Sequence, residues 1–183
     1  MTQNNKPSTQ LIIDIAQQTL TLFQEHTEVC CYPISTAKNG IGSQQDSGCT
    51  PLGAHVIAQK IGGNELIHTV FIGRVATGEI YSTALSAQHS ERDWILSRIL
   101  WLSGLETGIN KGSNGQGCCD TFQRYIYIHG TPDSEPMGIA RSHGCVRMRN
   151  QDIVELFAQV DEGTPVSIIE GVTGIDSITN TCE

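Results

Sequence analysis

Two short segments, residues 128–132 and 142–148, hold the side chains with the clearest capacity for chemistry. Cys145 could act as a nucleophile, but a free cysteine thiol is only slightly ionised at neutral pH and needs a base or a positive neighbour. His143 lies two residues from Cys145, so in an extended chain both side chains leave the same face. His129 ends a predicted strand, and a returning loop can bring Cys145 back to it. The pattern therefore indicates a cysteine–histidine pair with two candidate bases.

Spacing alone leaves other interpretations of these residues open. Gly144 suits the unusual backbone of an oxyanion-binding turn. Cys145 could equally be a small buried apolar residue, and His129 a polar residue at a strand end. The chain has 7 cysteines, an odd count, and the vicinal pairs at 30–31 and 118–119 lack the spacing of zinc or thioredoxin sites. We therefore interpret those pairs as structural and predict no metal site.

A resemblance to a known family adds to this pattern. The chain reads Tyr-Ile-His-Gly-Thr from residue 127 and Ser-His-Gly-Cys-Val-Arg-Met from residue 142, and it resembles the catalytic domain of L,D-transpeptidases, often called the YkuD domain. The resemblance extends over residues 10–170 and is most specific in the pairing of His129 with the Ser-His-Gly-Cys motif. The matching segments are 12–14, 32–36, the Thr-Pro-Leu-Gly turn at 50–53, 127–131, 142–148 and 163–166.

The resemblance implies a catalytic role for several of these residues. Cys145 corresponds to the nucleophile that takes the acyl group as a thioester, and His129 to the general base and later acid. His143 corresponds to a second histidine that orders the site. The backbone carbonyl of Gly130 corresponds to the group that orients the histidine. No cofactor is implied.

A second set of matching residues is implied to bind the substrate. The backbone N–H groups of His143, Gly144 and Cys145 correspond to the oxyanion hole, and Ser142 opens the same substrate-binding segment. Arg147 stands where family members carry Arg or Asn. Because Arg offers a forked donor suited to carboxylates, Arg147 is expected to bind a substrate carboxylate or to brace the loop.

These residues must be positioned by a mainly β fold, which we expect to be a YkuD-like β-sandwich or open barrel with one or two short helices. Residues 93–102 fit a strand and a helix equally well. The clearest helix is 150–160, with Asn150 as its expected N-cap. One catalytic domain at 10–170 is expected between a flexible tail at 1–9 and a C-terminal tail at 171–183. The predicted strands are 11–15, 19–23, 28–35, 54–60, 70–74, 124–129 and 166–169.

Composition excludes several classes of protein. The 183 residues are 38% hydrophobic and 16% charged, which suits a folded domain and argues against disorder. The net charge of -8 leaves no basic patch for nucleic acid or an anionic membrane. No stretch approaches the roughly 20 apolar residues of a membrane span. If Met1 is the native start, the N-terminus lacks a signal peptide and predicts a cytoplasmic protein; otherwise we expect a periplasmic one.

Motif and resemblance together predict a cysteine enzyme acting on peptidoglycan stem peptides or muropeptides. It would attack the bond between the L-centre of a third-position diamino acid and the terminal D-Ala. Transfer to water gives an L,D-carboxypeptidase of cell-wall recycling, which the cytoplasmic prediction favours. Transfer to an amine of another stem peptide gives a crosslinking L,D-transpeptidase. A non-catalytic muropeptide-binding module is a further alternative, while a papain-like protease is disfavoured because no Cys…His order with an Asn or Asp orienter is found.

Overall fold

The computed structural model describes residues 8–171, which are mainly β, with 43% strand and 10% helix. This confirms the predicted fold class. The predicted tails at 1–9 and 171–183 fall almost wholly outside the described residues. The strands are β1 (Thr9–Asp14), β2 (Thr19–Gln24), β3 (Thr27–Pro33), β4 (Gly53–Ile61), β5 (Thr69–Ile72), β6 (Val75–Ile80), β7 (Ile95–Gly104), β8 (Ser113–Asn114), β9 (Gly117–Cys118), β10 (Tyr127–Gly130), β11 (Val146–Met148) and β12 (Pro165–Ile169), and the helices are α1 (Thr83–Gln88) and α2 (Asn150–Gln159).

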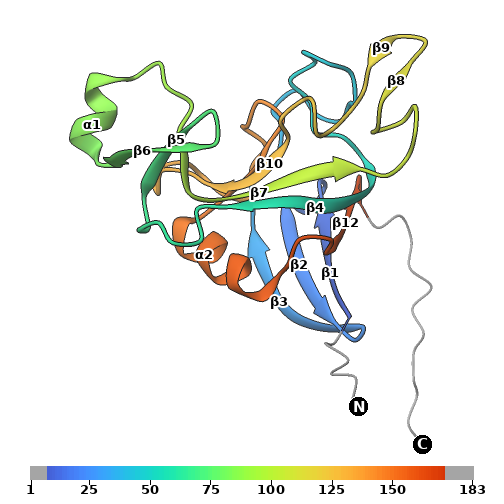
Figure 1. Cartoon of the computed structure of the whole chain (residues 1–183), viewed down its shortest axis with the longest axis horizontal. Coiled ribbons are helices and arrows are strands. Elements are labelled where there is room, and N and C mark those ends of the chain that lie inside the picture. The colour runs from blue at the N-terminus through green and yellow to red at the C-terminus, as the bar shows by residue number, and fades with distance from the viewer. Residues whose placement is uncertain (1–7, 172–183) are drawn as a thin grey trace, which may run out of the picture.

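One mixed sheet organises the described part of the chain. Its strands follow the order β11-β10-β7-β4-β12-β1-β2-β3, and β5 joins it by pairing with β7 and β6. The β10–β11 and β1–β12 pairs are parallel, whereas the other pairs of this sheet are antiparallel. The sheet curls so that β1, β2 and β3 lie below β4 and β7 in Figure 1, with α2 beside them. This is the open, curled β arrangement that the sequence predicts.

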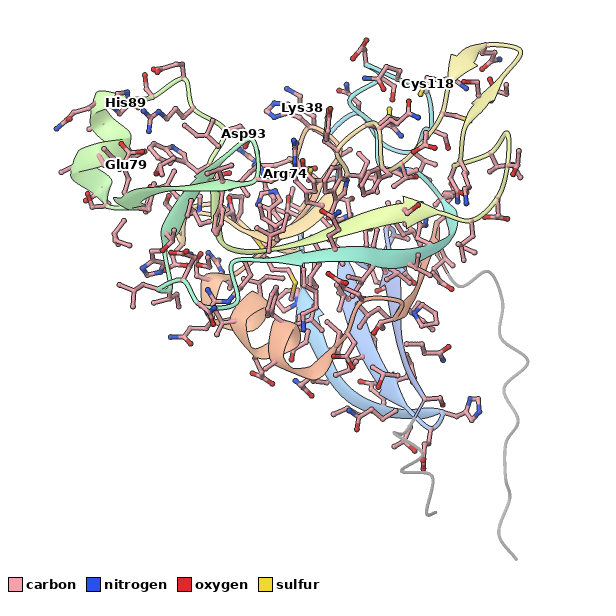
Figure 2. All side chains as sticks on the ribbon, viewed as in Figure 1. Lys38, Arg74, Glu79, His89, Asp93 and Cys118 are labelled. Atoms are coloured by element: carbon pink, nitrogen blue, oxygen red, sulfur yellow. The ribbon has the colours of Figure 1, made fainter. Side chains whose placement is uncertain are left out.

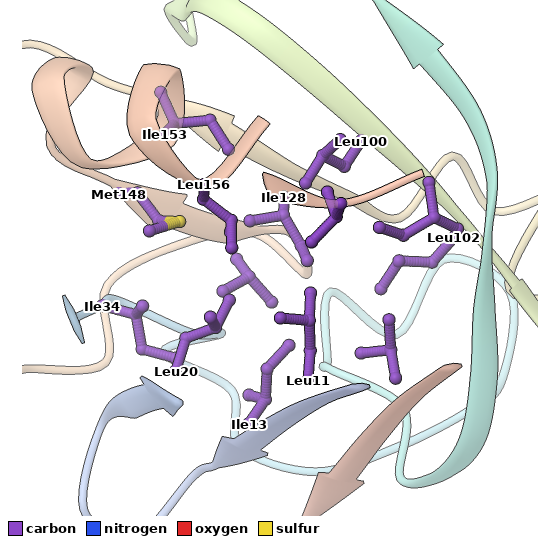
Figure 3. Packing of buried hydrophobic residues seen from close by; sticks show 14 of the residues in the cluster. Leu11, Ile13, Leu20, Ile34, Leu100, Leu102, Ile128, Met148, Ile153 and Leu156 are labelled. Carbon is purple, nitrogen blue, oxygen red and sulfur yellow. The ribbon is translucent and has the colours of Figure 1, made fainter. Parts of the chain in front are cut away.

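The main core fills the space between the two ends of the curled sheet, where α2 packs against β7 and β10 (Figure 3). Alternating residues of β1 and β2 point into it, as the period of two in their sequences predicts. The side chains that meet there include Leu11, Ile13, Leu20, Ile34, Leu100, Leu102, Ile128, Met148, Ile153 and Leu156.

Residues 93–102, for which strand and helix fitted equally well, lie mostly in strand β7. Seven consecutive residues, 96–102, are buried, because one face of β7 packs into the main core and the other supports a second cluster around Trp101. A strand buried on both faces is apolar throughout and loses the alternation that would identify it. The ambiguity therefore came from burial and not from weak strand preference.

Several short elements differ from the predicted ones. Helix α1 and strands β6, β8, β9 and β11 have no counterpart among the predicted strands and helices, because they are too short or too polar to show a period. Strand β10 begins at Tyr127, later than predicted, since a turn precedes it in which Tyr125 has a positive φ of 58°. None of the helices within residues 8–171 is long and apolar enough to cross a membrane.

Helix α2 confirms the predicted helix but not its predicted cap. Arg149 occupies the N-cap position and Asn150 is the first helical residue. The Asn150 side chain is buried and turned inward, where its amide donates to the carbonyl of Thr131 at 2.7 Å and its oxygen accepts from Ser97 Oγ at 2.6 Å. Asn150 therefore ties α2 to β7 and to the end of β10, instead of capping its own helix.

Replacing Asn150 with Ala should lower the free energy of unfolding by about 1–3 kcal/mol, because the substitution leaves the Ser97 hydroxyl and the Thr131 carbonyl without their partner. Urea unfolding followed by circular dichroism measures this change. Gln151→Ala, at the exposed neighbouring position, is the control and should stay near the wild-type value. Equal stability of the two variants would show that the Asn150 network does not stabilise the fold.

Candidate active site

The register of β10 and β11 sorts their side chains onto two faces. His129 pairs with Arg147 and Ile128 with Val146, and Cys145 lies directly before β11. Since successive side chains alternate across a sheet, Ile128 and Val146 enter the main core while His129, Cys145 and Arg147 share the opposite face. The parallel pair thus brings together three residues that the sequence analysis singled out.

Cys145 is half-buried, and its sulfur lies against the beginning of β10. The N–H of Tyr127 donates to Sγ at 3.4 Å, and the thiol donates to the carbonyl of Tyr125 at the same distance. The side chain also packs against a cluster that includes Trp101. Within the described residues, no hydrogen bond joins Cys145 directly to His129. The thiol therefore rests on the backbone of residues 125–127.

His129 is buried and held by its own strand end. Its Nδ1 lies 2.7 Å from the carbonyl of Gly130, which can only accept, so Nδ1 carries the proton and Nε2 keeps its lone pair. Nε2 has no partner in residues 8–171. Because no fully buried side-chain nitrogen or oxygen there lacks a partner, Nε2 must reach accessible space. Gly130 itself has no room for a side chain, since a Cβ would lie 2.6 Å from Asn150 Oδ1 and 2.7 Å from the Leu96 carbonyl.

Burial keeps both groups uncharged at rest. It raises the pKa of the Cys145 thiol to about 11, although the N–H of Tyr127 acts in the opposite direction. Burial also lowers the pKa of His129 to about 4, against the favourable hydrogen bond to the Gly130 carbonyl. At neutral pH the site therefore holds a neutral thiol and a neutral imidazole. This arrangement allows His129 to accept a proton, as a general base must.

The loop before Cys145 is fixed by hydroxyl groups. Thr50 Oγ1 accepts from the N–H of Ala37 at 3.0 Å and donates to the carbonyl of Gly144 at 2.9 Å, and Ser142 Oγ donates to the carbonyl of Cys145. Gly144 has a φ of 135°, and a Cβ there would lie 3.2 Å from Ile126 Cδ1. The backbone angle therefore favours glycine, and any larger residue would also require the Ile126 side chain to shift.

Two of the three expected oxyanion donors are available in this arrangement. The N–H of Gly144 donates to Ser142 Oγ at 3.2 Å, whereas the N–H groups of His143 and Cys145 find no acceptor among residues 8–171. The Gly144 N–H departs from the sequence-based expectation because it donates within the turn and closes it. Unpaired N–H groups beside a nucleophile can stabilise developing negative charge on a carbonyl oxygen.

Asp93 is a site residue that the motif did not indicate. One of its carboxylate oxygens lies 2.7 Å from a terminal nitrogen of Arg147, and the other lies 3.1 Å from Nδ1 of the exposed His143. Burial opposes ionisation of this carboxyl, but Arg147 and His143 together hold its pKa below the usual value. A lone acidic residue before an apolar segment, 50 residues from His143, gives no sequence signal of this contact.

Arg147 is buried, and its charge is already balanced. Besides Asp93, it forms an ion pair with Glu135 at 3.5 Å. A guanidinium that is only 9% exposed and faces two carboxylates has little capacity left for a third. Of the two functions expected for Arg147, bracing fits these contacts and binding a substrate carboxylate does not.

The loop at 40–48 lies beside the turn that carries Cys145 and is held in place by Arg124. This guanidinium donates to the carbonyls of Gly42 and Cys49, at 3.2 and 2.8 Å, and to Ser47 Oγ at 3.3 Å. The Cys49 carbonyl in turn approaches Gly144. The loop thus supports the turn that carries Cys145. Within the described residues, no three His, Cys, Asp or Glu side chains are grouped to hold a metal ion.

Two cavities open next to these residues. The first, of about 290 Å³, is largely polar in its lining and includes Asp93, His143 and Arg147. The second, of about 490 Å³, is more apolar and lies on the side of Tyr125, whose carbonyl accepts from the Cys145 thiol. Figure 2 places Asp93 and Cys118, one residue from each lining, above β4 and β7 on the side opposite α2.

Known proteins resemble this chain in sequence and in fold. The family model of the L,D-transpeptidase catalytic domain (YkuD) matches residues 8–168. A probable L,D-transpeptidase of Escherichia coli strain K12, YbiS, is 49% identical over 47 residues, which are 26% of this chain and 15% of that protein. The chain thus aligns with only a small part of this curated relative.

Solved structures share the fold at low sequence identity. An L,D-transpeptidase from Mycobacterium smegmatis has a TM-score of 0.53 and 17% identity, covering 89% of this chain and 59% of that one. The L,D-transpeptidase LdtMt1, solved in complex with imipenem, has a TM-score of 0.53 and 18% identity over the same shares of the two chains. At such identity the likeness concerns the fold.

The buried, neutral His129 should make stability depend on pH. Its pKa is about 4 in the folded protein against 6.5 for an unfolded histidine, so its contribution is full above pH 6.5 and is lost as the pH falls toward 4. The loss amounts to about 3 kcal/mol. His129→Gln should make the plot of unfolding free energy against pH shallower over this window, by about one proton.

Denaturant unfolding at several pH values measures this slope. His55, whose pKa is also lowered to about 4 by burial, remains in the variant and should preserve part of the dependence. His55→Gln, away from the candidate site, should give a similar partial loss. An unchanged slope in His129→Gln would mean that His129 is not held neutral.

Proposed function

Because the chain belongs to the L,D-transpeptidase catalytic domain (YkuD) family, we propose that Cys145 takes the acyl group of a peptidoglycan stem peptide as a thioester. The observation that carries this proposal is the shared sheet face of Cys145 and His129, with Nε2 of His129 directed to accessible space. The substrate bond joins the L-centre of a third-position diamino acid to a terminal D-Ala. The chain is an L,D-transpeptidase-family enzyme. What we propose is its substrate and its acyl acceptor.

The first step begins from the neutral pair. As the substrate enters, the thiol exchanges its hydrogen bond to the Tyr125 carbonyl for one to Nε2 of His129. Sγ attacks the peptide carbonyl carbon while its proton passes to Nε2, so that the thiolate exists only as the bond forms. The pKa of about 11 makes this transfer necessary, because a stable thiolate is disfavoured in the resting site.

The second step releases D-Ala. The tetrahedral oxyanion accepts from the N–H groups of His143 and Cys145, which have no internal acceptor among residues 8–171. Collapse of this intermediate breaks the carbon–nitrogen bond, and protonated His129 gives its proton to the leaving amine. Cys145 then holds the acyl group, and His129 is again neutral and ready to activate the acceptor.

The acceptor decides the outcome of the reaction. Transfer to an amine needs room for two peptides, and the polar cavity near His143 together with the apolar cavity near Tyr125 supports transpeptidation as the main outcome. Hydrolysis to a tripeptide, the carboxypeptidase reaction, is the second candidate, because Nε2 of His129 has no partner among residues 8–171 and could activate a water molecule as the acceptor. Cytoplasmic localisation, which would favour hydrolysis, stays a prediction.

Incubation with a defined tetrapeptide should test both the chemistry and the acceptor. Crosslinked dimer and free D-Ala are expected as main products, and tripeptide as the minor product, resolved by chromatography and mass spectrometry. Cys145→Ala should abolish all products while the fold is retained. Cys118→Ala, in the wall of the apolar cavity, should retain most activity.

Covalent reaction with imipenem provides a second test of whether Cys145 is the nucleophile. Intact-mass analysis should detect one covalent adduct on the wild type and on Cys118→Ala, and none on Cys145→Ala. Comparable loss of product in both variants, or an adduct that persists without Cys145, would place the nucleophile elsewhere.

His129 and His143 should differ in their effect on rate. His129→Ala should lower kcat/KM by about 10²–10⁴-fold, the usual contribution of general acid–base catalysis, with a smaller change in substrate binding. His143→Ala and Asp93→Asn should each cost less, because those residues contact one another at the rim and not the thiol. Steady-state kinetics across pH measures the ranking. The reverse ranking, with the acid limb of the pH profile lost only in His143→Ala, would make His143 the base.

A further inference from the structure

Arg74 lies at the turn between β5 and β6 and has an unusual set of contacts. Its guanidinium carbon lies 4.8 Å from the ring centre of Trp101 and 4.8 Å from that of Tyr125. One terminal nitrogen donates to the hydroxyl of Tyr127 at 3.1 Å. No carboxylate of residues 8–171 forms an ion pair with it. Arg74 is therefore a positioned cation whose charge is not balanced by an anion of the described chain.

Aromatic contacts fix a guanidinium without consuming all its donors. The flat faces of Trp101 and Tyr125 attract the positive charge but accept no N–H in the plane of the group. Five N–H bonds leave an Arg side chain in that plane, and Tyr127 accepts one of them. The remaining donors keep the forked geometry that suits a carboxylate.

The position of Arg74 connects it to the nucleophile. It lines the cavity of about 490 Å³ together with Trp101, Tyr125 and Phe122. Cys145 packs against the same aromatic cluster, and its thiol donates to the carbonyl of Tyr125. Figure 2 shows Arg74 above β4 and β7, on the face that carries the site. The cavity that Arg74 lines therefore borders residues that contact the Cys145 side chain.

The other cations near the site are less suited to this task. The protein has a net charge of -8, which repels a peptide that carries carboxylates. Arg147, the cation in the motif, is buried against Asp93 and Glu135. Arg124 is engaged by the carbonyls of the 40–48 loop. Arg141, in the lining of the polar cavity, forms no ion pair among residues 8–171 but has no aromatic ring there to hold it in place. Arg74 is partly exposed, held in place by two rings and unbalanced, so it can offset the repulsion in the apolar cavity.

We propose that Arg74 binds a carboxylate of the peptide substrate, in the cavity beside Cys145. The proposal rests on the proposed function for the identity of the substrate, since a stem tetrapeptide ends in a carboxylate and its third residue can carry another on its side chain. Arg74 would hold one of these two groups with its free donors while Trp101 and Tyr125 keep the guanidinium in place. It is a substrate-binding residue and takes no part in proton transfer.

Binding to a protein that cannot turn over tests the proposal directly. In the Cys145→Ala background, Arg74→Gln should raise the Kd of the tetrapeptide by about tenfold to a hundredfold, the range for a hydrogen bond to a charged group. Arg74→Lys should give an intermediate loss, because Lys retains the charge without the fork. Isothermal titration calorimetry provides the Kd, and near-ultraviolet circular dichroism checks that the aromatic cluster is unchanged.

Modified peptides identify the carboxylate. One has an amidated C-terminus, and another has lysine as its third residue, which lacks a side-chain carboxylate. The Arg74→Gln effect should vanish with one of the two and persist with the other. Lys38→Gln is the charge control: it removes one positive charge from the same side of β4 and β7, outside the aromatic cavity, and should leave the Kd unchanged.

The outcomes separate this proposal from the function on which it rests. An Arg74 effect of equal size with all three peptides, or an equal loss in Lys38→Gln, would overturn the assignment of Arg74. Absence of turnover in the wild type, combined with an Arg74-dependent preference for the free carboxylate, would overturn the proposed reaction and leave Arg74 as a carboxylate site.

Discussion

The parallel pairing of β10 with β11 is the constraint on which the site depends. Ile128 and Val146 must enter the core, where they meet α2 and the strands of the opposite side, and burial of such side chains stabilises the fold by roughly 1.5–3 kcal/mol each. Because side chains alternate along each strand, His129 and Arg147 then lie on the other face of the sheet. A slip of one residue would expose the core residues and bury the site, so packing energy and catalytic geometry select the same register.

Rigidity around Cys145 comes from polar contacts with distant segments. Thr50 holds the Gly144 carbonyl, and Arg124 holds the loop that leads to Thr50. Asn150 joins α2 to Thr131, just beyond Gly130, whose carbonyl orients His129. Helix α2 thereby fixes the side of the site that carries His129, while Thr50 and the 40–48 loop fix the side that carries Cys145. Preorganised groups of this kind lower the cost of reorganisation when charge develops in a reaction.

Charge is arranged so that the centre of the site is neutral and its surroundings are not. Burial disfavours both the thiolate of Cys145 and the imidazolium of His129. Nearby, Asp93 and Arg147 are paired with each other, whereas Arg74 rests on aromatic rings and has no carboxylate partner among residues 8–171. A neutral pair does not attract counterions or water strongly. In the proposed reaction the pair becomes charged only when a substrate carbonyl is present to accept the electron pair from sulfur.

The sequence by itself determined the mainly β fold, helix α2 and two residues, His129 and Cys145, that the structure places on one sheet face, because these depend on local periodicity and on a compact motif. Tertiary structure alone decided what surrounds them. Asp93 reaches His143 across the fold, Arg147 is neutralised by two carboxylates, and Arg74 is left unbalanced on its aromatic support. Each of these depends on which strands neighbour each other in the sheet and on how its loops return. The register between segments far apart in the chain sets those contacts, and no local pattern of residues records it.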